Sequence, residues 1–225
     1  ADNVPDVSPS ASAAPVVVSE EDELVKAIDL SNPVTGEVIL EGEQQINSGV
    51  TVTEAGVLTL ADGSKLAIQN TGGLQCYGEI RIEDGTRATI EIWKTGGWNF
   101  LIYEGASIYV GEGATLTMEG SLWLKNGGTI ILEKGAALEV TKGDYSPWIE
   151  GVAIVDSGFQ ITYSGDVCYP DNLCIKEGAE VTLEMENYFS GTITAKKNSK
   201  VSLTTKGGFG GRFEAEEGAS MLVTS

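Results

Sequence analysis

Residues 103–140 read YEGASIYVGEGATLTMEGSLWLKNGGTIILEKGAALEV and repeat one short pattern several times. The pattern is a glycine, a small residue, and then apolar and polar positions in alternation. Copies begin at Gly105 and Gly127, and again at Gly113 and Gly135, so the members of each pair are 22 residues apart. Later copies begin at positions 178, 198 and 218, spaced by 20 residues. A fixed period of this length is typical of a solenoid, in which successive repeats stack into a coil.

Each copy predicts a short β-strand with one apolar and one polar face. Ile108 and Val110 are two residues apart, so both point to the same side of a strand. Stacking one turn on the next would align Ile108 with Ile130 and Leu116 with Leu138, which makes continuous apolar ladders. A turn of about 22 residues has room for three strands. We therefore expect an all-β fold, a single-stranded right-handed parallel β-helix. A two-sheet solenoid with a shorter coil is the alternative.

The predicted domain organisation is one β-helix over residues 19–225, preceded by a flexible tether over residues 1–18. The tether is rich in Ser, Ala and Pro. Ser19 followed by acidic residues predicts the start of a short helix over about residues 19–30, which would cap the N-terminal end of the coil. No comparable cap is visible after Met221 and Leu222. We therefore expect oligomerisation through the C-terminal end as one option.

The charge of the chain restricts its partners. The formal net charge is −19, from 33 acidic and 14 basic residues. A field of this sign repels nucleic acid and anionic membrane surfaces, so neither is an expected partner. No apolar run approaches the length needed to cross a bilayer, so we expect no membrane insertion. The chain opens with polar residues, and this segment resembles the tether that follows a removed secretory leader.

Three cysteines are present. Cys168 and Cys174 bracket the loop CYPDNLC, which a disulfide would close in an oxidising compartment, while Cys76 is left over. Buried free thiols are the alternative interpretation. The chain has no histidine, which argues against a structural zinc site and excludes a His-dependent nucleophile within the chain.

Several segments resemble the pectate-lyase-like superfamily of right-handed β-helices, in the form found on bacterial surfaces. They are SEEDELVKAI at 19–28, GEVILEG at 36–42, LTLADGSKLAI at 58–68 and the later copies of the repeat. The resemblance covers most of residues 19–225. It implies a protein that is secreted or tethered to a bacterial cell surface, but a shared fold does not establish an activity.

The catalytic motifs of that superfamily are missing. The polygalacturonases of the superfamily share a Gly-His-Gly motif and a pair of aspartates, and this chain has neither. Arg81–Glu83 reads RIE where those enzymes have Arg-Ile-Lys. The Trp-x-Asp-His sequence of its lyases is also absent. No cofactor is expected, although calcium binding by a cluster such as Asp144 with Glu150 stays open.

Aromatic residues gather where the repeat is interrupted. Rings with a polar edge suit the faces of sugars, and breaks in a solenoid map to loops on one side, often the binding side. Packing of these rings over widened seams is the alternative. The candidate ligand-binding residues are Trp98, Asn99, Asp144, Tyr145, Trp148 and Tyr169.

These observations predict a non-catalytic, adhesin-like scaffold that presents loops to a glycan or to a surface protein. A calcium-dependent, lyase-like enzyme acting on polysaccharides is the runner-up. An inert structural spacer is the third hypothesis.

Overall fold

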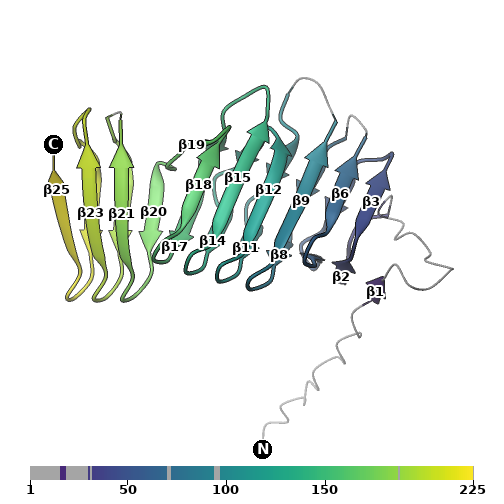
Figure 1. The fold of residues 1–225 in the computed structure, drawn as a ribbon, viewed down its shortest axis with the longest axis horizontal. Coiled ribbons are helices and arrows are strands. Elements are labelled where there is room, and N and C mark those ends of the chain that lie inside the picture. The colour runs from purple at the N-terminus through teal and green to yellow at the C-terminus, as the bar shows by residue number, and fades with distance from the viewer. Residues whose placement is uncertain are drawn as a thin grey trace, which may run out of the picture.

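The computed structural model describes residues 16–18, 30, 32–69, 72–93, 97–186 and 188–224. Within these ranges the chain is all-β and forms no helix. Its strands wind into an elongated parallel β-solenoid (Figure 1). The predicted capping helix lies outside the described residues apart from Leu30, and so does most of the predicted tether. Val16–Val18, which we assigned to the tether, form strand β1 and pair with the next strand.

One sheet runs the whole length of the rod. Sheet A has ten strands, and all of its pairings are parallel. Its strands in spatial order are β1, β2 (Glu37–Leu40), β5 (Val57–Leu60), β8 (Glu79–Ile82), β11 (Ser107–Val110), β14 (Thr129–Leu132), β17 (Val152–Val155), β20 (Asn172–Ile175), β22 (Thr192–Ala195) and β24 (Arg212–Ala215).

Three shorter sheets form the other sides of the coil. Sheet B comprises β4 (Val50–Val52), β7 (Leu74–Cys76), β10 (Phe100–Ile102), β13 (Leu122–Leu124) and β16 (Trp148–Ile149). Sheet C comprises β3 (Glu43–Ile46), β6 (Lys65–Ile68), β9 (Arg87–Ile92), β12 (Thr115–Gly120), β15 (Ala137–Lys142), β18 (Gln160–Tyr163) and β19 (Asp166–Val167). Sheet D comprises β21 (Glu180–Met185), β23 (Lys200–Thr205) and β25 (Ser220–Thr224).

The predicted register is confirmed. Ile108 pairs with Ile130 in sheet A, and Leu116 pairs with Leu138 in sheet C. Three strands, β11, β12 and β13, lie between Gly105 and Gly127. The central turns are therefore three-sided, and the two-sheet alternative does not describe them.

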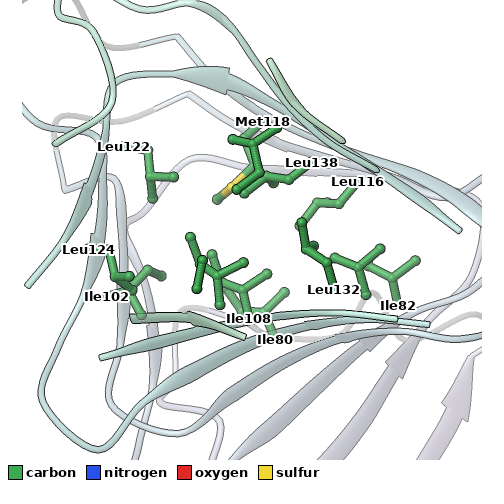
Figure 2. Close-up of a cluster of buried hydrophobic side chains, with 14 of the residues drawn as sticks. Ile80, Ile82, Ile102, Ile108, Leu116, Met118, Leu122, Leu124, Leu132 and Leu138 are labelled. Carbon is green, nitrogen blue, oxygen red and sulfur yellow. The ribbon is translucent and has the colours of Figure 1, made fainter. Parts of the chain in front are cut away.

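The core is the interior of the coil. Side chains from sheets A, B and C point inward to a common centre in Figure 2, and Ile80, Ile108, Leu116, Leu124 and Leu138 are all 0% exposed. Full burial of one such side chain contributes roughly 1.5–3 kcal/mol. Outward positions alternate with these along each strand, so the outer faces of the sheets are free to carry other chemistry.

The coil changes shape two-thirds of the way along. Sheet B ends at β16, and sheet C ends in the antiparallel pair β18–β19. Sheet D then takes over at β21, so only sheet A is continuous through this junction (Figure 1). Beyond it the register shortens to 20 residues, as Asn172 pairs with Thr192 and Thr192 with Arg212. The third side of these last turns is reduced to a bridge between Phe189 and Phe209.

Glycines occupy the corner that leads into sheet A in several turns. An added Cβ would lie 2.2 Å from the Gly56 carbonyl oxygen at Gly78, and 2.2 Å from the Gly128 carbonyl oxygen at Gly151. The same contact to Asp171 at Gly191 would be 1.9 Å. Consecutive turns therefore approach so closely here that a side chain would collide with the backbone of the turn before it.

Candidate functional site

Two tryptophans stack on the outer face of sheet B. Trp123 on β13 pairs directly with Trp148 on β16, and their ring centroids are 5.1 Å apart with the planes 5° from parallel. Both rings point outward because their neighbours Leu124 and Ile149 point into the core. Since β16 is the last strand of sheet B, no strand of that sheet covers Trp148 on its far side. Trp148 is 49% exposed.

Two further rings complete this cluster. The centroid of Trp98 lies 5.7 Å from that of Trp123, 5.9 Å from that of Trp148 and 5.3 Å from that of Tyr145. Tyr145 is itself 49% exposed. We call Trp98, Trp123, Tyr145 and Trp148 the aromatic patch. The structure thus brings together three of the predicted ligand-binding residues and adds Trp123 to them.

A polar layer beneath the patch joins loops from three successive turns. The Asn99 side-chain oxygen accepts a hydrogen bond from the Ser121 backbone N–H at 2.9 Å. The Ser121 hydroxyl accepts one from the Tyr145 backbone N–H at 3.1 Å. Asn99 is only 2% exposed, and its Nδ2 has no partner among the described residues. Asn99, predicted as a ligand contact, is therefore buried next to Trp98, where it links its own loop to that of Ser121.

A second aromatic stack adjoins the patch. Tyr77 and Tyr103 lie with centroids 4.2 Å apart and planes 13° from parallel. The Lys125 ammonium sits 4.0 Å from the Tyr103 ring centroid and 4.8 Å from that of Trp123, which links the two groups by cation–π contacts. A hydrogen bond with Tyr103 is the main cause of a raised pKa at Tyr77. The Trp123 indole N–H donates to Glu150 at 3.0 Å.

The inner rings of the patch and of the adjoining tyrosine stack contact one another or Lys125, whereas the rings at the end of the patch keep a face exposed. Trp123 contacts Trp148, and the Lys125 ammonium lies over its ring. Tyr103 is covered by Tyr77 and again by Lys125. Only a ring with a free face can stack on a flat apolar ligand surface, so Trp148 and Tyr145 are the rings best placed to do so.

A cleft of about 740 Å³ opens beside the patch, at the junction where the coil changes shape. Ser146 and Pro147, between the patch residues Tyr145 and Trp148, form part of its wall. Its other lining residues include Tyr163, Asp166, Tyr169, Asp171, Glu184 and Tyr188.

Two more of the predicted ligand-binding residues lie in this cleft and on the turn beside it. Tyr169 lines the cleft rather than joining the patch, and its hydroxyl accepts a hydrogen bond from the Glu184 backbone N–H at 3.2 Å. Burial raises the pKa of Tyr169. Asp144 is exposed on the turn that carries Tyr145.

The cysteines are free thiols in the structure. Cys168 lines the cleft, whereas Cys174 alternates with the buried Leu173 and Ile175 on β20. The predicted pairing of Cys168 with Cys174 is not formed here and stays a prediction. Burial raises the pKa of both thiols, and it raises the pKa of Cys76 to about 12.

Two kinds of feature are absent from the described residues. They contain no group of three or more His, Cys, Asp or Glu side chains arranged to hold a metal ion. They also contain no helix long and apolar enough to cross a membrane.

Comparison with known proteins gives no relative from which a function could be transferred. No family model matches the chain, no curated protein matches it, and no solved structure matches it.

Proposed function

We propose that this protein is a non-catalytic, adhesin-like β-solenoid that binds a glycan through the aromatic patch. The observation that carries the proposal is the pair of half-exposed rings, Tyr145 and Trp148, at the open end of a stack. Aromatic rings that expose a face and keep a polar edge suit the apolar faces of sugars. The hydrogen bonds through Asn99 and Ser121 hold these rings in place before any ligand arrives, which lowers the entropic cost of binding.

The net charge of −19 disfavours polyanionic polysaccharides and nucleic acid as ligands of the patch.

The same proposal includes the handedness of the coil, its N-terminal cap, the location of the protein and a disulfide. We propose a right-handed coil of the pectate-lyase-like kind, with a helical cap near residues 19–30 and a location outside the cell or on its surface. A disulfide between Cys168 and Cys174 would accord with that location. Alkylation of purified protein without reductant, followed by mass spectrometry, tests it. Both cysteines carrying the alkyl group would contradict the pairing.

Glycan binding is tested by affinity electrophoresis through gels cast with neutral glycans, mucin and pectate. The informative variant is Trp148→Ala, and the matched control is Trp93→Ala. Trp93 is 59% exposed but follows β9 of sheet C, on a different side of the coil from sheet B. We expect one glycan to retard the wild type and the Trp93 variant, and not the Trp148 variant. Equal retardation of all three proteins, or of none across the panel, would refute binding through the patch.

A further inference from the structure

The cleft beside the aromatic patch exists because the solenoid narrows. Sheet B stops at β16. In the next turn Tyr169 and Pro170 precede β20 without forming a strand, and one turn later Phe189, which makes a single bridge to Phe209, precedes β22. The step between the wider and the narrower turns leaves the hollow of about 740 Å³. A ligand chain that stacks on Trp148 and continues toward the C-terminal turns therefore meets this hollow next.

Aromatic side chains line part of the cleft, and hydrogen bonds hold two of them in place. Tyr163 donates its hydroxyl proton to the Gly143 carbonyl at 3.1 Å, which ties the cleft wall to the start of the turn that carries the patch. Tyr169 is held by its bond from the Glu184 backbone. Tyr188 also lines the cleft and is 61% exposed. The patch and the cleft adjoin through Ser146 and Pro147, and both carry aromatic side chains.

All charged side chains among the described residues that line the cleft are acidic. Asp166, Asp171 and Glu184 line it, are exposed and make no ion pair within the described part of the chain. Glu186 also lines it, but both of its oxygens accept hydrogen bonds from Lys206 at 2.7 Å. Among the described lining residues none is a lysine or an arginine. An occupant must therefore bring positive charge to complement three carboxylates.

We propose that the cleft selects the ligand of the patch, and that this ligand is an amino-sugar polymer with free, protonated amines. This inference rests on the proposed glycan binding. Sugar faces stack on Trp148 and on the tyrosines, while the ammonium groups donate charge-assisted hydrogen bonds to Asp171, Glu184 and Asp166. An acetylated polymer of the same sugar retains the stacking faces but lacks the charge.

The test compares two probes with the same sugar backbone, the hexamers of β-1,4-linked glucosamine and of its N-acetyl form, in which acetylation replaces each charged amine by a neutral amide. Calorimetry at mildly acidic pH and low salt would measure both on the wild type and on an Asp171→Asn, Glu184→Gln double variant. We expect the wild type to prefer the amine form by about tenfold, because the two ion pairs at stake involve solvent-exposed carboxylates and each contributes little. We expect the double variant to lose that preference and to keep its affinity for the acetylated hexamer.

Several outcomes would overturn the inference. One is equal affinity for the two hexamers, and another is a preference that survives in the double variant. Binding of oligolysine without binding of the glucosamine hexamer would make the cleft a peptide site instead. The proposed function is judged separately: an acetylated hexamer that binds the wild type and not the Trp148→Ala variant upholds the patch even where the preference for amines fails.

Discussion

The corner glycines offer a direct test of how closely the turns of the coil must pack. We consider Gly151→Ala, because Gly151 lies between β16, the last strand of sheet B, and β17, which it directly precedes. The added Cβ would lie 2.2 Å from the Gly128 carbonyl oxygen and 2.8 Å from Leu124 Cδ2, whereas ordinary contact begins at 3.4 Å. Leu124 is 0% exposed and has no free space to move into.

The size of the effect follows from these contacts. The Gly128 carbonyl accepts the Val152 backbone N–H at 3.1 Å, so it cannot withdraw from the new Cβ without lengthening that hydrogen bond. Overpacking of a close-packed site costs about 1–3 kcal/mol, and a weakened buried hydrogen bond costs about 1 kcal/mol. We therefore expect Gly151→Ala to lower the free energy of unfolding by about 2–4 kcal/mol.

The assay is urea unfolding followed by tryptophan fluorescence, which reports locally because Trp123 and Trp148 lie in the neighbouring strands. Gly36→Ala is the matched control: it occupies the same corner before β2, and no described atom lies within 4 Å of its added Cβ. We expect the control to change stability by less than about 1 kcal/mol. A Gly151 variant as stable as the wild type, with an unchanged slope against urea, would refute the close-packing argument.

Three other predictions test the core, the surface charges and the buried thiol. Leu116→Ala should lower the free energy of unfolding by about 2–5 kcal/mol in the same assay, because Leu116 is fully buried. Leu222 is 66% exposed, so Leu222→Ala should lower it by less than about 0.5 kcal/mol. Equal losses in the two variants would contradict the apolar ladder assigned to Leu116. Glu216 accepts a hydrogen bond from Lys196, so NMR should show a Glu216 pKa below the usual 4.5, and Lys196→Ala should bring that pKa back toward 4.5. Because the pKa is lowered in the folded state, the pair stabilises the fold above pH 4.5, and this contribution is lost as the pH falls through the folded-state pKa. Cys76, with a pKa of about 12, should react with a thiol reagent at neutral pH only after unfolding, and immediate labelling of the native protein would contradict its burial.

Much of the fold was predictable because the side chains of one turn repeat in the next. The spacing of 22 residues between Gly105 and Gly127 predicted the pairing of Ile108 with Ile130, and the structure confirms it. The site was less predictable. Trp98, Tyr145 and Trp148 could be predicted as ligand-binding residues because they lie where the repeat is interrupted. Trp123 lies inside a regular strand, so the sequence around it gives no sign of a binding role. Its partnership with Trp148 depends on a spacing of 25 residues that no repeat in the sequence announces.

The sequence by itself determined that the chain is a parallel solenoid with apolar ladders, because alternation and period act through neighbours that recur at every turn. Only the tertiary structure decided where sheets B and C stop, and that this junction places the patch beside an acidic cleft. It also decided that Asn99 is buried, whereas Tyr145 and Trp148 are half-exposed. The physical reason is that such features depend on the register between turns of unequal length, and that register is set by packing across the whole coil.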